Sequence, residues 1–408
     1  MFKFEDPNCL ILDTLGCGLI QELRSKQPLQ PFSPDLVDFL DALSKHLLTH
    51  KRIREFADIA AFAFFCRRKN LEAWKYRLRM ENEMRFGRGL AYHITPSNIP
   101  LNFAFSFLLG FLSGNTNVVR VPSAKFEQVA IIIESLRKAE IELPVSPLVG
   151  RSYFVSFDKE DSLGEYLTKH CDVRVIWGGD TTINNIRNTA ISSHAVDVVF
   201  PDRYSLCLID AGAVLETSNI SRLASNFFND TYLFDQLACS SPHLVIWFGD
   251  DNSVERAKAK FWAAVQDIVH KIYTTHIITG VNKFTNFCVQ SLQEEVSLES
   301  TRFINHDNSV WRVRMESDPR NLEDFRVGGG YFVEHKIQTL EMLSKFINRK
   351  TQTLSYYGFP KSILECALTS VGAFGINRVV PVGRSMEFSL IWDGHDLIRS
   401  LSRRVEVS

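Results

Sequence analysis

The sequence lacks the short cysteine and histidine spacings that hold metal ions. Its eight cysteines are widely separated and form no Cys-x-x-Cys pair, so the sequence indicates neither a zinc site nor a disulfide framework. Carboxylate clusters with metal-ligand spacing are absent too. We therefore expect no metal centre, and we expect the unpaired thiols to lie in a reducing, cytoplasmic compartment.

Long apolar runs and an excess of one charge are also lacking. The most apolar stretch, residues 99–112, contains Pro100 and Gly110 and is too short to span a bilayer. The first residues do not resemble a secretory signal, because no charged segment precedes a long apolar core. The formal net charge is -1, which argues against a general nucleic-acid binder and against electrostatic membrane binding.

What the chain does have is enough apolar sequence for two or three domains. Its 408 residues are 45% hydrophobic and 23% charged, as in a soluble globular protein. Residues 1–85 have mainly helical patterns. From residue 90 strands and helices alternate, which predicts a parallel sheet with crossover helices. The first predicted elements are a strand at 90–94, a helix at 101–112, a strand at 117–121 and a helix at 126–139.

The alternation continues through a Gly-Gly loop. Gly178 and Gly179 follow a predicted strand and precede a predicted helix. Glycines let a backbone approach a phosphate closely, and a helix N-terminus favours anions. An ordinary tight turn is the alternative, because a bare Gly-Gly pair is a weak signal. The strands of this region are predicted at 153–157, 172–177, 196–200 and 205–209, and the helices at 162–169 and 183–187.

Cys239 precedes a continuous apolar run, residues 244–248, which predicts a buried strand. Small polar residues around the cysteine leave room for a substrate. A thiolate at this place could act as a nucleophile. The alternative is that Cys239 is one more small buried hydrophobe.

After Cys239 the pattern repeats as a second α/β unit. Residues 292–299 are polar and loop-like, and residues 328–330, three glycines, are expected to form a flexible turn. The other elements are predicted as helices at 254–272, 338–348 and 360–369 and as strands at 310–315, 331–333 and 353–357.

Four separated motifs together resemble the LuxC family, the acyl-CoA reductase component of the fatty acid reductase of luminous bacteria. The motifs are YHITPSNIPLN at 92–102, VRVIWGGD at 173–180, FPDRYS at 200–205 and DQLACSSP at 235–242. The ending FSLIWDG at 388–394 is similar to that family as well. The resemblance extends from about residue 87 to the end of the chain.

LuxC proteins in turn resemble the aldehyde dehydrogenase superfamily, which implies an α/β fold of three parts. These are a Rossmann-like cofactor domain, a catalytic α/β domain that carries the cysteine, and a small oligomerisation element. We expect residues 1–205 to hold a helical region and the NADP-binding domain, and residues 206–375 to form the catalytic domain. Residues 376–408 are expected to return to the cofactor domain or the oligomer interface, in a homo-oligomer.

The resemblance also implies a catalytic pair. Cys239 matches the superfamily's catalytic cysteine, and Asn98 matches the asparagine whose amide helps to form the oxyanion hole. Aldehyde dehydrogenases carry a glutamate that activates water, but residues 199–204 contain no glutamate. An enzyme that must keep its acyl thioester from water has no need of that base.

The same comparison implies a nucleotide site. Arg120 replaces a lysine that reaches the cofactor ribose, and Ser123 replaces a glutamate that holds the ribose hydroxyls. Loss of an anion beside a guanidinium favours a 2′-phosphate, so we expect NADPH rather than NADH. The residues expected to bind the cofactor are Thr95, Pro96, Arg120, Ser123, Gly178, Gly179, Asp180, Thr181 and Glu323.

These expectations describe an NADPH-dependent reductase. It would convert a long-chain fatty acyl-CoA or acyl-protein thioester into an aldehyde through an acyl-cysteine on Cys239, with an acyl-protein synthetase as partner. The alternatives are a CoA-acylating aldehyde dehydrogenase that works oxidatively and a non-catalytic scaffold of an acyl-transfer complex.

Two questions stay open at this level. The group that activates Cys239 is undecided: His243, His93 and Arg203 are candidates, and each has a structural alternative. The phenylalanines within residues 103–111 could line an acyl tunnel, or they could pack a helix against the sheet.

Overall fold

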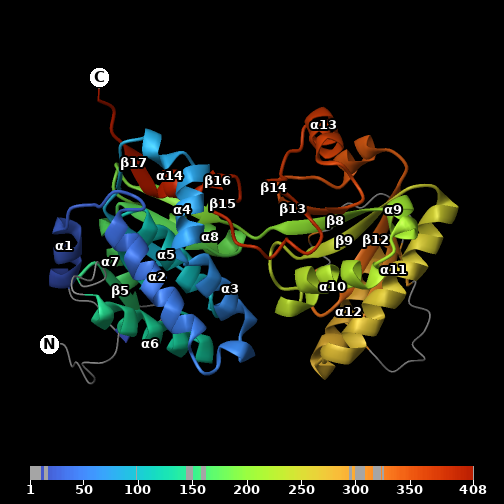
Figure 1. The fold of residues 1–408 in the computed structure, drawn as a ribbon, viewed down its shortest axis with the longest axis horizontal. Helices are drawn as coiled ribbons and strands as arrows, with labels where there is room; N and C mark the ends of the chain where they lie inside the picture. The colour runs from blue at the N-terminus through green and yellow to red at the C-terminus, as the bar shows by residue number, and fades with distance from the viewer. Residues whose placement is uncertain are drawn as a thin grey trace. The chain divides into compact units, whose positions relative to one another are not determined.

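A computed structural model describes residues 11–12, 17–97, 99–143, 150–157, 162–293, 296–298, 308–315, 323 and 326–407 (Figure 1). The chain forms two compact units. The first unit is residues 1–201 with 388–408, and the second unit is residues 202–387. The divisions predicted from the sequence were 205/206 and 375/376. In the structure the chain returns to the first unit at Phe388, 12 residues after the predicted boundary at residue 376.

The sheet of the first unit is parallel and has the strand order β1-β5-β4-β3-β6-β7. Strand β3 is central: β4 and then β5 follow on one side of it, and β6 and then β7 follow on the other side. The order therefore reverses between β3 and β6, where Ile94 pairs with Ile176. Ligands of such sheets bind beyond the carboxyl ends of the strands at this point. The strands are β1 (Ile11–Leu12), β3 (Leu90–Ile94), β4 (Thr116–Arg120), β5 (Ser152–Val155), β6 (Val173–Trp177) and β7 (Val196–Phe200).

Helices cover this sheet, and the first unit also has two short antiparallel ladders, of which one joins distant parts of the chain and the other is a local hairpin. Strand β2 (Arg85–Gly87) pairs with β17 (Ser402–Arg404) near the end of the chain, and β15 (Ile391–Trp392) pairs with β16 (His395–Asp396). The helices are α1 (Cys17–Ser25), α2 (Pro34–Leu48), α3 (Ala57–Phe65), α4 (Arg68–Arg77), α5 (Asn102–Leu112), α6 (Glu127–Glu142), α7 (Ser162–His170), α8 (Asp180–Arg187) and α14 (Leu397–Leu401), with 3-10 turns η1 (Ile53–Glu55) and η2 (Met80–Asn82).

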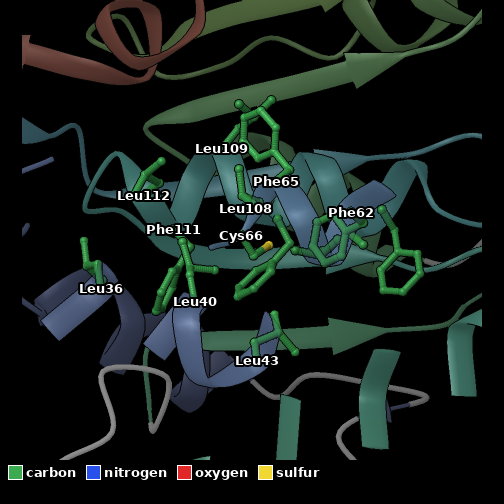
Figure 2. Packing of buried hydrophobic residues seen from close by; sticks show 14 of the residues in the cluster. Leu36, Leu40, Leu43, Phe62, Phe65, Cys66, Leu108, Leu109, Phe111 and Leu112 are labelled. Carbon is green, nitrogen blue, oxygen red and sulfur yellow. The ribbon is translucent and has the colours of Figure 1, made fainter. Parts of the chain in front are cut away.

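The phenylalanines of α5 pack this helix into the core of the first unit. Phe103, Phe107 and Phe111 are buried, and Phe107 lies 5.1 Å from Phe154 of β5 between ring centroids. Figure 2 shows side chains of α2, α3 and α5 gathered in the same cluster. Of the two alternatives for these rings, the structure therefore shows the packing one.

The sheet of the second unit has seven strands in the order β10-β11-β12-β9-β8-β13-β14. All neighbours are parallel except β10 with β11. Because β8, β9 and β13 run the same way, their amino ends meet at one edge. The strands are β8 (Tyr204–Asp210), β9 (Pro242–Phe248), β10 (Val296–Leu298), β11 (Trp311–Met315), β12 (Tyr331–Ile337), β13 (Thr351–Tyr357) and β14 (Arg378–Pro381).

Helices α10 and α11 bury a second aromatic core against this sheet. Phe227, Phe261 and Trp262 pack together, with Trp247 of β9 next to Phe261. Asp250 caps α11 by accepting a hydrogen bond from the Ser253 backbone, which fixes where the helix starts. The helices are α9 (Ala211–Glu216), α10 (Ile220–Thr231), α11 (Asp251–Ile272), α12 (Ile277–Gln293) and α13 (Lys361–Val371), with 3-10 turns η3 (Tyr232–Phe234) and η6 (Leu340–Lys345).

Two predicted elements of the second unit were wrong. Residues 292–299 were expected to be a loop, but α12 continues to Gln293 and Val296–Leu298 forms the edge strand β10. A three-residue edge strand gains its stability from pairing with β11, which leaves little local signal. The helix expected at 338–348 is only the 3-10 segment Leu340–Lys345.

Among the described residues no helix is long and apolar enough to cross a membrane. In the same part of the chain, no group of three or more His, Cys, Asp or Glu side chains could hold a metal ion.

The packing of α5 predicts a stability difference between two phenylalanines. Phe107→Ala should lower the free energy of unfolding by about 3–5 kcal/mol, because it leaves a cavity between helix and sheet. Phe105→Ala is the matched control, since Phe105 is only partly buried on the same helix, and should cost less. Urea denaturation of both variants checks this. A loss below about 1 kcal/mol for Phe107→Ala would contradict the packed core and favour an open channel.

Candidate active site

Cys239 lies between η3 and β9, at the edge where the amino ends of β8, β9 and β13 meet. Its side chain is partly exposed. The hydroxyl of Ser205, near the start of β8, donates to the Cys239 carbonyl oxygen at 2.6 Å. The cysteine is therefore accessible while its backbone is tied to the sheet.

The loop before the cysteine is held by a buried amide. Asp235 and Gln236 both adopt the left-handed region, with φ of 51° and 58°, which costs on the order of 1 kcal/mol or more per residue. Gln236 is fully buried, and its Nε2 donates to the carbonyl oxygens of Pro242 and Tyr331 at 3.0 Å each. Its Oε1 accepts from the backbone N–H groups of Gly330 and Tyr331. These four hydrogen bonds hold the strained loop in its conformation.

The three glycines at 328–330 form the turn that the sequence predicted, and this turn supports the same loop. The Gly329 N–H donates to the Asp235 carbonyl oxygen at 2.8 Å. A Cβ on Gly328 would collide with that oxygen, and one on Gly330 would collide with the Ser309 carbonyl oxygen. Gly329 and Gly330 also have φ of +72° and +89°. Glycine is required here for close packing and for positive φ.

A glutamine that the sequence analysis missed contacts the sulfur. Gln352, at the start of β13, is buried, and its Nε2 donates to Cys239 Sγ at 3.2 Å. The hydroxyl of Thr353 donates to Gln352 Oε1 at 3.3 Å. The two sites are 113 residues apart. The strand sequence TQTLSYY contains several polar residues and did not single out Gln352, which lies near the cysteine because β13 pairs with β8.

A second missed residue, Arg378, begins β14 and pairs in register with Thr353. Its guanidinium donates to the carbonyl oxygens of residues 384, 385 and 387, at 2.9, 2.7 and 2.5 Å. Burial lowers the pKa of Arg378, and among the charges that raise it again is that of an ionised Cys239. Arg378 therefore holds a turn beside the cysteine and brings positive charge to the sulfur.

The turn at 383–387 also contacts the loop of Cys239. Met386 Sδ accepts hydrogen bonds from the hydroxyls of Ser240 at 3.5 Å and Ser241 at 3.8 Å. Asp230 of α10 fixes the other side of the turn by accepting from the backbone N–H groups of Gly383 at 2.6 Å and Ser385 at 2.9 Å. Burial raises the pKa of Asp230 to about 6.

The three residues predicted as possible activators of the thiol make contacts with groups other than Cys239. His243 is buried in β9, where its ring stacks on Tyr204, and burial lowers its pKa to about 3. His93 lies in the first unit, bonded to Ser106 at 2.8 Å, and burial lowers its pKa to about 4. Arg203 donates to the carbonyl oxygen of Arg349 at 2.5 Å. The two histidines are therefore neutral near pH 7 and serve the packing.

The predicted nucleotide residues of the first unit gather where the strand order reverses. Thr95 follows β3, and its hydroxyl donates to the carbonyl oxygen of Arg120 at the end of β4, at 2.5 Å. The guanidinium of Arg120 donates to the Phe157 carbonyl oxygen at 3.0 Å and lies over the Phe157 ring. Pro96 follows Thr95, and Ser123 is exposed before α6. Asn98, in the same loop as Pro96, lies outside the described residues.

The Gly-Gly loop connects β6 to α8 at the same point. The Gly178 N–H donates to the Phe200 carbonyl oxygen at 3.2 Å, and Gly179 is the N-cap of α8. Gly179 has no side chain with which to cap this helix start, where Asp180 and Thr181 are exposed. A Cβ added to Gly179 would meet nothing within 4 Å. The N–H groups of the first turn therefore border open space that an anionic group could occupy.

A buried ion pair supports the far end of α8. Arg174 of β6 binds both carboxylate oxygens of Asp197 on β7, at 2.8 and 2.9 Å. Its Nη1 donates to the carbonyl oxygens of Ile186 and Thr189, where α8 ends. The position of α8 relative to the sheet is thus set by bidentate, charge-assisted hydrogen bonds.

Glu323 is the one predicted nucleotide residue in the second unit. Its carboxylate accepts from Asn348 Nδ2 at 3.4 Å, and its carbonyl oxygen accepts from Arg326 Nε at 3.2 Å. Its neighbours at 324 and 325 lie outside the described residues. A role of Glu323 toward the nicotinamide ribose therefore stays a prediction.

The fold of this chain is that of known dehydrogenases. Solved structures of 1-pyrroline-5-carboxylate dehydrogenase from Thermus with bound NAD (TM-score 0.64, 14% identity, 95% of this chain and 83% of that chain) and of lactaldehyde dehydrogenase (TM-score 0.66, 11% identity, 95% and 89%) have the same fold. The chain therefore has the aldehyde-dehydrogenase-like α/β fold that the sequence predicted.

The family follows from a match to residues 20–405, nearly the whole chain. The profile that matches is that of acyl-CoA reductase (LuxC), and the chain belongs to this family. Curated relatives are the long-chain acyl-protein thioester reductases of Vibrio harveyi (25% identical over 325 residues, 78% of this chain and 64% of the relative) and Aliivibrio fischeri (23% over 322 residues, 77% and 62%). The chain thus spans slightly under two thirds of the length of these relatives.

The Asp230 carboxyl predicts a specific pH dependence of stability. Its pKa in the folded state, about 6, lies above the ordinary aspartate value, so its contribution to stability is full at low pH and disappears as pH rises through 6. Between pH 4.5 and 7 the free energy of unfolding of the wild type should fall by about 2 kcal/mol relative to Asp230→Asn.

Chemical denaturation of both proteins across this pH range checks the expectation. Asp267→Asn is the control, because Asp267 is an exposed aspartate on α11. Parallel pH curves for wild type and Asp230→Asn would show that the buried carboxyl titrates normally.

Proposed function

We propose that this protein reduces a long-chain fatty acyl thioester to the aldehyde through an acyl-cysteine on Cys239. The observation that carries the proposal is the partly exposed sulfur, held in an over-determined loop with an amide donor 3.2 Å away. The names of the curated relatives support this reaction type. Both acyl-CoA and an acylated protein are thioesters that the cysteine could accept.

The first step is a thioester exchange. The Cys239 thiolate attacks the acyl carbonyl carbon, the new carbon–sulfur bond forms, and the donor thiol leaves with the electron pair of the old bond. Asn98 is proposed to donate to the developing oxyanion. A donor in such a position is worth roughly 3 kcal/mol of transition-state stabilisation.

The acyl-cysteine must then escape hydrolysis. The carboxylate within residues 199–204 is that of Asp202, and it is engaged in an ion pair with Arg326. That segment therefore offers no free base to activate water. This supports transfer of the acyl group to hydride rather than to water.

The residues at the switch point fit a nicotinamide coenzyme, which when bound supplies the hydride. The start of α8, with glycine at its N-cap, and the open space beside Gly179 suit its pyrophosphate. Arg120, at the end of β4, together with Ser123 in place of an acid, favours a 2′-phosphate and hence NADPH. Thr95, Pro96, Gly178, Asp180, Thr181 and Glu323 complete the proposed set.

The other expectations remain proposals of the same kind. They are a homo-oligomer, a cytoplasmic location and an acyl-protein synthetase as partner. An oxidative, CoA-acylating dehydrogenase would use the same cysteine in reverse, and the concentrations of coenzyme and thioester decide the direction. A non-catalytic scaffold would not need Cys239. The experiment on Cys239 described next therefore distinguishes a scaffold from the reductase and from the oxidative dehydrogenase.

The acyl-cysteine predicts a covalent adduct. Intact-protein mass spectrometry after mixing with acyl-CoAs, and with an acylated protein donor, should show one acyl group on the wild type and none on Cys239→Ala. Addition of NADPH should discharge the adduct as aldehyde. Cys288→Ala is the matched control, because Cys288 is an exposed cysteine on α12, and it should keep the adduct. An adduct that survives in Cys239→Ala, or none with either donor, would overturn the proposal.

The open space beside Gly179 predicts that a side chain at this position weakens nucleotide binding without lowering the stability of the protein. Gly179→Ala should change the free energy of unfolding by less than about 1 kcal/mol, because reduced freedom of the unfolded chain offsets the poorer cap. It should nevertheless weaken NADPH binding at least tenfold, because the methyl group enters the space of the pyrophosphate.

Calorimetric titration with NADPH and NADH checks this separation. Gly18→Ala is the control, since a Cβ at Gly18 on α1 also meets nothing within 4 Å. Unchanged NADPH affinity in Gly179→Ala would place the phosphates elsewhere.

A further inference from the structure

We propose that Gln352 is a catalytic residue: its side-chain amide donates a hydrogen bond to the thiolate of Cys239 and so determines how readily this sulfur ionises. The inference rests on the proposed function only in taking Cys239 as the nucleophile. No family motif pointed to Gln352.

The contact is short and its orientation is defined. Nε2 of Gln352 lies 3.2 Å from Cys239 Sγ, and Oε1 accepts the hydroxyl of Thr353 at 3.3 Å. With the amide turned over, Oε1 would face a thiolate, and two acceptors would repel each other. The observed orientation is therefore the one that serves the charged sulfur.

The donor and the sulfur are held by one bridge. The Ser205 hydroxyl accepts from the Thr353 N–H at 3.2 Å and donates to the Cys239 carbonyl oxygen at 2.6 Å. The backbone of Gln352 is fixed as well, because its carbonyl oxygen accepts from the Asn377 N–H at 2.9 Å. Strands β8, β13 and the cysteine loop thus fix the distance between amide and sulfur.

Burial makes this hydrogen bond effective. Gln352 is 2% exposed, so little water competes for its N–H, and a hydrogen bond to an ionised group is stronger in such surroundings. Positive charge near the sulfur also favours the thiolate. Arg378 on β14 brings positive charge, with Asp230 of α10 and Glu387 bordering the guanidinium, while buried His243 on β9 is neutral.

The same hydrogen bond affects two steps of the reaction. It favours the thiolate that attacks the thioester, because the thiolate is the reactive form. It also favours release of the aldehyde, when the carbon–sulfur bond of the thiohemiacetal breaks and its electron pair returns to Cys239. In the intervening acyl-cysteine the sulfur carries no charge, and the donor contributes little.

The test is the pH profile of alkylation of Cys239 by iodoacetamide, followed for each cysteine by peptide mass spectrometry. Gln352→Glu replaces the donor by an acceptor of the same shape, and Gln352→Met removes the donor at similar length. In both, the midpoint for Cys239 should rise by about one to two pH units, the worth of a hydrogen bond to a charged group.

Three controls make the result specific. Cys288 and Cys366 are exposed in the same molecule, and their midpoints should not move. Gln338→Glu makes the same chemical change at an exposed glutamine and should leave Cys239 unaffected. If the Gln352 variants melt far below the wild type, Thr353→Val, which removes the hydroxyl that orients the amide, should still raise the midpoint in the same direction.

The outcomes for Gln352 and for the proposed function are distinguishable, because alkylation needs neither substrate nor coenzyme. An unchanged Cys239 midpoint in folded Gln352→Glu and Gln352→Met overturns the inference, even if acyl thioesters acylate the cysteine. A raised midpoint supports it, even if no acyl donor forms an adduct and the proposed function fails.

Discussion

The amide of Gln236 is the interaction on which the geometry of Cys239 depends. Two successive residues in the left-handed region, Asp235 and Gln236, are unfavourable by themselves, and strained backbone persists only where its surroundings over-determine it. The buried amide does so with four hydrogen bonds to the backbone of Pro242, Gly330 and Tyr331. The loop, the start of β9 and the start of β12 are thereby locked together, and the cysteine takes its place from them.

The two units use opposite edges of their parallel sheets. In the first unit, the residues proposed to bind the nucleotide follow the carboxyl ends of β3, β4 and β6, where strand order reverses and a helix N-terminus is available. In the second unit, the reactive sulfur lies at the amino edge, before β9 and beside the start of β13. A thiolate there meets polar side chains and a guanidinium from the neighbouring strands.

The positive charge near the sulfur is that of Arg378, which binds the turn at residues 384–387. Arg378 satisfies three carbonyl oxygens of residues 384–387, and Asp230 satisfies two N–H groups of the same turn. The opposing charges allow both groups to be buried, since a lone buried charge would cost several kcal/mol. Neither group is a conventional activating base. The proposed activation of the thiol therefore rests on the hydrogen bond from Gln352 and on the positive charge of Arg378.

The sequence by itself determined the α/β class, most strand and helix positions of the first unit and the family, and it predicted Cys239 as the nucleophile, because alternating apolar runs and local motifs are written in consecutive residues. The tertiary structure decided what touches the sulfur. Gln352 reaches Cys239 only through parallel pairing of β13 with β8, over 113 residues. The structure also showed why this turn needs glycine at residues 328 and 330, since the collisions that a Cβ would cause there involve carbonyl oxygens distant in the chain. Local sequence carries no record of such contacts.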